Sequence, residues 1–162
     1  MLGSYWQEAP ASAGTAQPAR IPDAAAPAAT VLVVEDEERI REMIAMLLTE
    51  QGYSVIEAED GPAGLSVVQS AARLDLLLTD IGLPGLNGRQ LADAARVRRP
   101  GLPVLLITGY AGAAMDDADL PPEMEVLRKP FTFDKLTDRV RALIEDLDIR
   151  TSARSQSDSP DR

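Results

Sequence analysis

The sequence contains neither histidine nor cysteine. Without cysteine the chain can form no disulfide framework and no thiolate metal site. Without histidine it has no Ser-His-Asp triad, no imidazole metal ligand and no histidine that could donate a phosphoryl group. Aromatic residues make up only 4% of the chain, although 45% of all residues are hydrophobic. The core is therefore expected to consist mainly of valine, leucine, isoleucine and alanine.

Basic residues are also scarce, because 16 lysines and arginines stand against 26 acids and give a net charge of −10 over 162 residues. Contacts with phosphate groups need clustered lysine and arginine, so this balance argues against DNA and anionic membranes as partners. No stretch approaches the roughly 18 consecutive apolar residues of a membrane span. The first residues lack the charged and apolar regions of a signal peptide. These absences predict a cytoplasmic protein that binds neither DNA nor membrane.

Two tails flank the regular part of the chain. Residues 1–29 are rich in alanine and interrupted by proline, and they are expected to form a disordered leader. Residues 149–162 are polar without periodicity and are expected to form a disordered tail. A single domain is therefore predicted over residues 30–148. No second folded domain is expected after it.

Short apolar runs alternate with amphipathic segments in this domain. Strands are predicted at 31–34, 53–58, 75–79, 104–108 and around 126–127, and helices at 40–48, 61–73, 87–99 and 136–147. The segment 109–124 is expected to hold a fourth helix that is short or mobile, because acids stand at its C-terminal end and two prolines follow. Alternating strands and helices predict an α/β fold, a flavodoxin-like doubly wound sheet of five parallel strands in the order 2-1-3-4-5 with helices on both faces.

Polar residues follow the carboxyl ends of four predicted strands, the edge at which such sheets bind ligands. They are Glu35, Asp36, Asp80, Thr108 and Lys129. Each has a structural alternative, since Asp36 could cap the first helix and Asp80 could be a turn residue. Thr108 could bond to backbone, and Lys129 could be a solvated charge. The presence of all five residues at these strand ends is much less expected by chance than the presence of any one of them.

The chemistry of these residues is coherent. Glu35, Asp36 and Asp80 at one rim would repel one another unless a cation intervened. Carboxylate ligands without histidine or cysteine suit Mg²⁺. One Asp80 oxygen could then attack phosphorus, while the Lys129 ammonium neutralises phosphoryl oxygens and the Thr108 hydroxyl donates a hydrogen bond to one of them.

Four segments, VLVVEDEERIR, LLLTDIGLPGLNG, PVLLITGYA and VLRKPF, resemble the signature segments of bacterial two-component response-regulator receiver domains. The resemblance covers roughly residues 30–147. The sequence of the second segment also resembles the corresponding segment in receiver domains of hybrid sensor kinases. It implies that Asp80 is the phospho-acceptor. It also implies that Asp36 and Asp80 ligate Mg²⁺ directly, Glu35 through water and Gly82 through its backbone carbonyl.

The same resemblance implies that Thr108 is the switch hydroxyl and Lys129 the phosphate-pairing amine, with a cis bond between Lys129 and Pro130. The chain departs from the family at Val126, where many relatives carry an aromatic switch residue. Tyr110 is a possible substitute. A second departure is Gly82, because relatives often carry a side chain there that influences phosphoryl lifetime.

The implied function is phosphoryl transfer from a histidine kinase or a histidine phosphotransfer protein to Asp80, which switches interactions with a downstream protein. The chain would then catalyse its own phosphorylation and dephosphorylation without being a turnover enzyme. Four arginines of the helix at 87–99 are either a docking patch or a solvated face: Arg89, Arg96, Arg98 and Arg99.

Two other functions remain open at this point. A phosphatase of the haloacid-dehalogenase type also uses a strand-end Asp nucleophile with Mg²⁺, but it needs a second Asp two residues on, where this chain has Gly82. A receiver-like binding module that never takes a phosphoryl group would have no need of Asp36, Asp80, Thr108 and Lys129 together.

Overall fold

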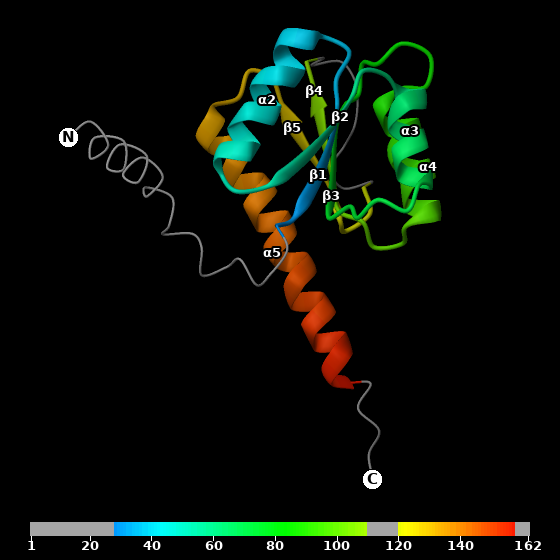
Figure 1. The fold of residues 1–162 in the computed structure, drawn as a ribbon, viewed down its shortest axis with the longest axis vertical. Coiled ribbons are helices and arrows are strands. Elements are labelled where there is room, and N and C mark those ends of the chain that lie inside the picture. The colour runs from blue at the N-terminus through cyan, green and yellow to red at the C-terminus, as the bar shows by residue number, and fades with distance from the viewer. Residues whose placement is uncertain (1–27, 110–119, 158–162) are drawn as a thin grey trace, which may run out of the picture.

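The computed structural model describes residues 28–109 and 120–157. In this part of the chain, five parallel strands form one sheet in the order β2-β1-β3-β4-β5. The strands are β1 (Thr30–Val34), β2 (Ser54–Ala58), β3 (Leu76–Asp80), β4 (Val104–Thr108) and β5 (Met124–Arg128). The helices are α2 (Glu38–Glu50), α3 (Gly61–Gln69), α4 (Gly88–Arg98) and α5 (Phe133–Ser157). The predicted fold class and strand order are confirmed (Figure 1).

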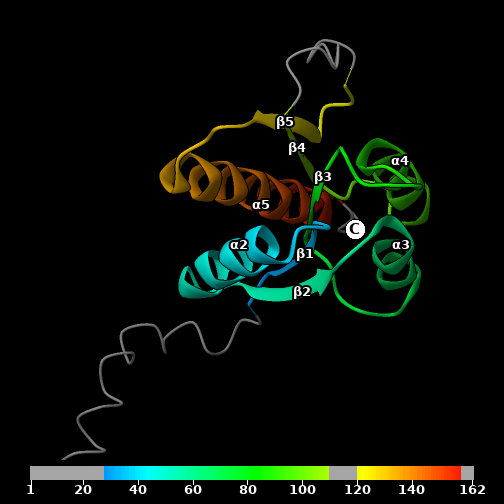
Figure 2. The ribbon, with the colours of Figure 1, turned by 90° about the horizontal axis from the view of Figure 1, so that it is seen from above.

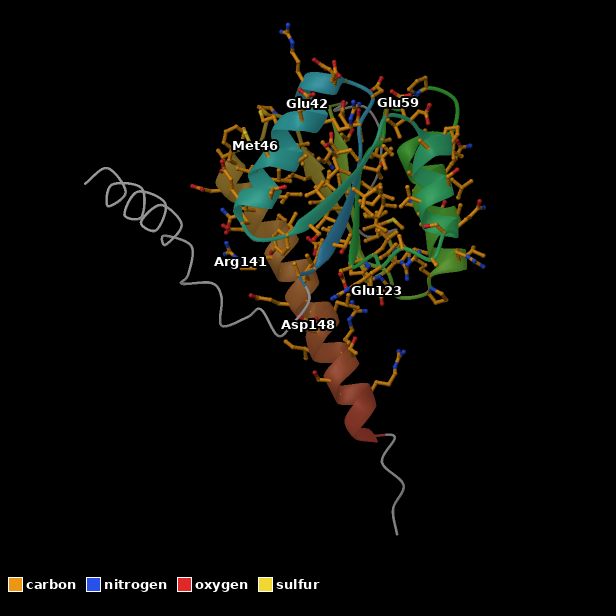
Figure 3. All side chains as sticks on the ribbon, viewed as in Figure 1. Glu42, Met46, Glu59, Glu123, Arg141 and Asp148 are labelled. Atoms are coloured by element: carbon orange, nitrogen blue, oxygen red, sulfur yellow. The ribbon has the colours of Figure 1, made fainter. Side chains whose placement is uncertain are left out.

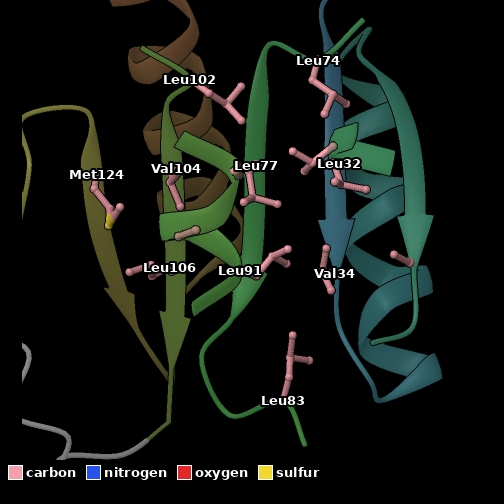
Figure 4. Close-up of a cluster of buried hydrophobic side chains, with 14 residues drawn as sticks. Leu32, Val34, Leu74, Leu77, Leu83, Leu91, Leu102, Val104, Leu106 and Met124 are labelled. Atoms are coloured by element: carbon pink, nitrogen blue, oxygen red, sulfur yellow. The ribbon is translucent and has the colours of Figure 1, made fainter. Parts of the chain in front are cut away.

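The sheet is covered on both faces, α2 and α5 lying on one face and α3 and α4 on the other (Figure 2). Successive side chains of a strand point to opposite faces. Val31 and Val33 of β1 accordingly join the cluster under α2 and α5, whereas Leu32 and Val34 join the cluster under α3 and α4. Figure 4 shows the second cluster. Because both faces are buried, the strands are continuous apolar runs rather than alternating ones.

Gly88 ties the start of α4 to the end of β3. A Cβ atom at this position would lie 2.1 Å from the backbone oxygen of Asp80, closer than any side chain permits. The Gly88 N–H donates to the Ile81 carbonyl at 3.1 Å. The loop between β3 and α4 therefore folds back tightly on the strand end that carries Asp80.

Helix α3 ends at Gln69, earlier than the end at residue 73 that its periodicity predicts. Two arginines of the α4 C-terminus donate to the carbonyls there, Arg99 to Val68 at 3.0 Å and to Ser70 at 2.9 Å, and Arg98 to Gln69 at 3.3 Å. The final carbonyls of a helix lack partners within it. The arginines at the end of α4 supply such partners, and the Ser70 hydroxyl donates to the Val67 carbonyl at 2.6 Å.

Helix α5 extends to Ser157, well into the segment 149–162 that the sequence predicts to be disordered. That prediction is wrong as far as Ser157. No proline or glycine interrupts residues 133–157. Arg150 also fixes the extension, because it donates to the Asp146 carbonyl at 3.3 Å and to the Glu123 carboxylate at 3.1 Å.

Three predictions lie outside the described residues. They are the disorder of the leader up to residue 27, the short or mobile helix within 110–119 together with the role of Tyr110, and the tail 158–162. Within the described ranges, no helix is long and apolar enough to cross a membrane.

Candidate functional site

Three carboxylates meet at the carboxyl edge of the sheet. Glu35 and Asp36 follow β1, and Asp80 is the last residue of β3. One carboxylate oxygen from each of the three lies within 4.8 Å of the others. Glu35 is only 3% exposed, whereas Asp36 is exposed and Asp80 is half-buried. The structure therefore brings together the acids that the sequence predicts to hold a metal.

Glu35 carries the strongest electrostatic perturbation at this edge. Burial raises the pKa of its carboxyl from 4.5 to about 7, and the negative charges of Asp80 and Asp36 add to the increase. The Glu37 N–H, which donates to the Glu35 carboxylate at 3.3 Å, and the Lys129 ammonium act in the opposite direction on this pKa. Burial is thus the main reason that the Glu35 carboxyl holds its proton more tightly, and the neighbouring acids add to it.

Backbone hydrogen bonds fix Asp80 in its position. The Ile81 N–H donates to the Ile107 carbonyl of β4 at 2.8 Å, and the Thr79 hydroxyl donates to the Asp80 carbonyl at 3.1 Å. The Gly82 N–H donates to the Asp80 carboxylate at 3.3 Å. Asp80 can therefore be a turn residue and also have a chemical role. Its carboxylate can accept the hydrogen bond from the Gly82 N–H and still face the other two acids.

Thr108 and Lys129 end the neighbouring strands at the same edge. Thr108 is 3% exposed, and its carbonyl accepts the Lys129 N–H at 2.8 Å. The Lys129 side chain runs past Gly109, where an added Cβ would lie 3.6 Å from the lysine Cδ. The ammonium is close enough to Glu35 to lower the pKa of that carboxyl. The predicted cis bond between Lys129 and Pro130 is confirmed.

The capping alternative for Asp36 is not what the structure shows. Glu37 occupies the N-cap position of α2 and makes no side-chain capping bond. Asp36 lies one residue earlier, with its carboxylate in the acidic cluster. This placement leaves its charge available to a cation.

Arg41 contributes to the site, and the sequence reasoning missed it. Its guanidinium donates to the Glu35 carbonyl at 2.9 Å and pairs with the Glu57 carboxylate at 3.4 Å. It therefore holds the chain just after β1 against the end of β2. The local pattern around Arg41 gives no signal for this role, because the Glu57 partner belongs to β2.

Neither of the two interpretations, a docking patch or a solvated helix face, describes all four arginines of the α4 region. Arg89 pairs with Asp93 at 3.1 Å on an exposed face, as a solvated helix surface does. Arg96 pairs with Glu123 at 2.8 Å, and Arg98 and Arg99 bind the end of α3. Three of the four are engaged inside the domain.

Comparison with known proteins decides the family. The profile of the family described as response regulator receiver domain matches residues 31–141. The chain belongs to this family. It is the receiver domain of a response regulator in two-component signalling, with the five-stranded fold that such domains share.

Three relatives illustrate the similarity. The response regulator receiver protein CpdR of Brucella abortus is 32% identical over 115 residues, which are 70% of this chain and 95% of that protein. A probable transcriptional regulatory protein of Picosynechococcus is 39% identical over 125 residues, 72% of this chain, but the chain spans only 49% of its length. The crystal structure of the receiver domain from the hybrid histidine kinase CckA has a TM-score of 0.61 at 34% identity and covers 71% of this chain and 98% of that one.

Proposed function

We propose that this receiver is a phospho-accepting switch and that Asp80 accepts the phosphoryl group. The observation that carries the proposal is the meeting of three carboxylates within 4.8 Å at the carboxyl edge of the sheet, beside Lys129. The donor is a phosphohistidine of a histidine kinase or phosphotransfer protein, because this chain contains no histidine.

The donor set at this edge fits Mg²⁺. Carboxylate oxygens are hard ligands, and a Mg²⁺ site uses one or two of them together with water and phosphate oxygens. Burial and the neighbouring charge of Asp80 raise the pKa of Glu35 to about 7, and a bound cation would favour its charged form. Asp36 and Asp80 would hold the ion directly, Glu35 through water and Gly82 through its carbonyl. Once bound, Mg²⁺ would neutralise the carboxylates and the phosphoryl oxygens.

The transfer is a displacement at phosphorus. A carboxylate oxygen of Asp80 forms the new P–O bond while the P–N bond to the donor imidazole breaks, and the electron pair of that bond stays on the donor nitrogen. The Asp80 side chain is half-buried, so a donor can approach it from solvent. The Gly82 N–H positions the carboxylate, and Lys129 supplies a fixed positive charge for the transferred oxygens.

Phosphorylation adds about −1.5 to −2 charges and three acceptor oxygens at this spot. The Thr108 hydroxyl donates to one of these oxygens, and Lys129 pairs with another. A charge-assisted hydrogen bond contributes about 1.5–3 kcal/mol. Moving a two-state equilibrium from mostly off to mostly on takes about 5.5 kcal/mol of differential interaction. Two such contacts approach that amount.

The output is a change in binding to a downstream protein. Val126 of β5 is half-buried and packs against the core cluster under α3 and α4. An aliphatic side chain in that position cannot exchange between inward and outward ring orientations. The change after phosphorylation would therefore begin at the Thr108 hydroxyl rather than at the side chain of residue 126.

The test is the intact mass of the full chain after incubation with Mg²⁺ and a small phosphodonor or a phosphorylated kinase. Wild type should gain one phosphoryl group, and Asp80→Asn should gain none. Asp93→Asn, the same change at an exposed acid of α4, should behave as wild type. If wild type gains no mass with any donor, the interpretation that remains is a receiver-like binding module that is not phosphorylated. Repeated turnover of a small phosphate ester would instead favour the haloacid-dehalogenase reaction.

A further inference from the structure

Three hydrogen bonds fix Glu35 within the acidic cluster. Its N–H donates to the Ala58 carbonyl at 3.1 Å, and its own carbonyl accepts the Arg41 guanidinium at 2.9 Å. Its carboxylate accepts the Glu37 N–H at 3.3 Å. The position of this buried carboxylate therefore depends on two backbone contacts, and one of them comes from a side chain of α2.

Arg41 is itself anchored to β2. Its Nη1 atom donates to the Glu35 carbonyl, while its Nε atom pairs with the Glu57 carboxylate at 3.4 Å. Only 14% of the Arg41 side chain is exposed. The end of β2 thus holds Glu35 twice, directly through Ala58 and indirectly through Glu57 and Arg41.

The stability of α2 does not account for the placement of Arg41. It is the fourth residue of the helix, and a cation close to a helix N-terminus meets the positive end of the macrodipole. Its partner Glu57 belongs to β2 rather than to α2. Glu42, the next residue of α2, and Glu59, just beyond β2, lie at the same end of the domain (Figure 3). Arg41 therefore connects the start of the helix to the end of the strand.

The rigidity of this connection bears on the choice of ion. Mg²⁺ requires a nearly octahedral set of ligands, whereas Ca²⁺ accepts more ligands in a more variable arrangement. Ligands that cannot move exclude the arrangements that Ca²⁺ uses, and a loosened ligand can adapt to it. Glu35 is only 3% exposed, so its carboxylate has little room to move unless its backbone moves too.

We propose that Arg41 is a positioning residue that keeps Glu35 rigid and thereby favours Mg²⁺ over Ca²⁺ at the acidic edge. The inference rests on the proposed function, because it requires that these acids bind Mg²⁺. Loss of a group that orients a metal ligand typically lowers metal affinity about 10–100-fold. Arg41 acts on the backbone of Glu35 rather than on its carboxylate, so the lower end of this range is expected.

Charge and positioning predict opposite effects for the loss of this guanidinium. A positive charge near three carboxylates repels a cation. Removal of the charge alone would therefore strengthen the binding of Mg²⁺ and of Ca²⁺ equally, since both ions carry two charges. Loss of positioning would instead weaken Mg²⁺ binding and weaken Ca²⁺ binding less. The ratio of the two affinities separates these explanations.

The test titrates Mg²⁺ and Ca²⁺ separately into the metal-free full chain and follows the NMR amide signals of Asp36, Asp80 and Gly82. Arg41→Met keeps most of the aliphatic stem and removes the guanidinium. Its Mg²⁺ affinity should fall about tenfold, and its Ca²⁺ affinity by less than about threefold. Glu57→Gln should cause a smaller loss of Mg²⁺ affinity. The double variant should be no weaker than Arg41→Met, because both changes break the same connection.

Two matched variants separate position from charge. Arg39→Met removes an exposed arginine from the same turn of α2 and should not weaken Mg²⁺ binding. Arg41→Lys keeps the charge but lacks the planar fork that reaches two acceptors, so it should retain only part of the Mg²⁺ affinity. Thermal melts in EDTA verify that each variant is folded. In EDTA the Glu35 amide should also exchange its hydrogen faster in Arg41→Met than in wild type.

The proposal is overturned if Arg41→Met leaves the ratio of the two affinities unchanged, or if the losses in Arg41→Met and Glu57→Gln are additive. In either case, saturable shifts in wild type would leave the metal site itself standing. If wild type gives no saturable shifts with either ion, the metal site is overturned, and the role of Arg41 with it.

Discussion

Glu35 and Asp80 face each other across adjacent strands. The register pairs Val34 of β1 with Thr79 of β3, so the next residue of each strand is one of these two acids. Their carboxylate oxygens lie within 4.8 Å of each other. Two carboxylates held this close repel each other when both are charged, and either a proton or a cation relieves that repulsion. Mg²⁺ and pH should therefore both affect this edge of the sheet.

Mg²⁺ should stabilise the folded protein through this cluster. A ligand that binds only the folded state stabilises it by about 2.7 kcal/mol at a concentration 100 times Kd. Thermal melts with and without Mg²⁺ should show a higher Tm in wild type and no change in Asp36→Asn. Glu50→Gln removes an exposed acid at the far end of α2 and should respond to Mg²⁺ as wild type does. An equal Mg²⁺ response in Asp36→Asn would rule out the cluster as the metal site.

The stability of the metal-free protein should depend on the protonation of Glu35. Folding raises the pKa of this carboxyl from 4.5 to about 7, so the folded state binds its proton more tightly. The resulting stabilisation is complete below pH 4.5 and is lost as the pH rises through 7. Its full size is about 3 kcal/mol.

Urea unfolding in EDTA from pH 4.5 to 8 measures this effect. The free energy of unfolding of wild type should fall with rising pH relative to that of Glu35→Gln, which cannot lose a proton. Addition of Mg²⁺ should remove the difference in slope. Parallel pH profiles for the two proteins would show that Glu35 does not titrate in this range.

Two glycines near Asp80 should differ in the stability that their replacement by alanine costs. A Cβ at Gly88 would lie 2.1 Å from the Asp80 backbone oxygen, whereas one at Gly82 would lie 3.8 Å from the Asp80 carboxylate. Gly88→Ala should therefore cost at least about 2 kcal/mol of unfolding free energy, because backbone must move. Gly82→Ala should stay within about 0.5 kcal/mol of wild type. Urea midpoints compare the two directly, and equal losses would contradict the close approach at Gly88.

Glu123 should anchor the extension of α5. Its carboxylate binds both Arg96 of α4 and Arg150 of α5. Glu123→Gln should speed hydrogen exchange of the amides beyond Arg150, while global stability falls by less than about 1 kcal/mol, because the pair with Arg150 is partly exposed. Asp138→Asn, which breaks the exposed pair with Arg141 on the same helix, should leave exchange in the extension unchanged. Unchanged exchange in Glu123→Gln would show that packing alone holds the extension.

The sequence was most informative where local pattern decides structure. Apolar runs that stop at polar residues predicted the strands, because strands buried on both faces allow few alternatives. The same stops predicted which acids share an edge, since parallel strands end together. The candidate set Glu35, Asp36 and Asp80 was predictable for this reason.

The prediction failed where distant side chains determine a helix end. Helix α3 ends at Gln69, where the Ser70 hydroxyl donates to the Val67 carbonyl at 2.6 Å and where Arg98 and Arg99, from the end of α4, bind neighbouring carbonyls. Helix α5 continues to Ser157 partly because Arg150 reaches Glu123 before β5. In each case one partner of the arginine contact lies far away in the sequence, so the local periodicity does not indicate the contact. The role of Arg41 was missed for the same reason, because its partners are the carbonyl of Glu35, just after β1, and the carboxylate of Glu57 on β2.

The length of α5 gives the domain a lever. At about 1.5 Å per residue, its 25 residues form a rod about 37 Å long. Its first half packs against the sheet, and its second half extends past the amino edge (Figure 1), where the pair between Arg150 and Glu123 holds its base. A slight tilt at this base is therefore magnified at the tip. A small rearrangement near β5 would then produce a larger displacement at the end of α5.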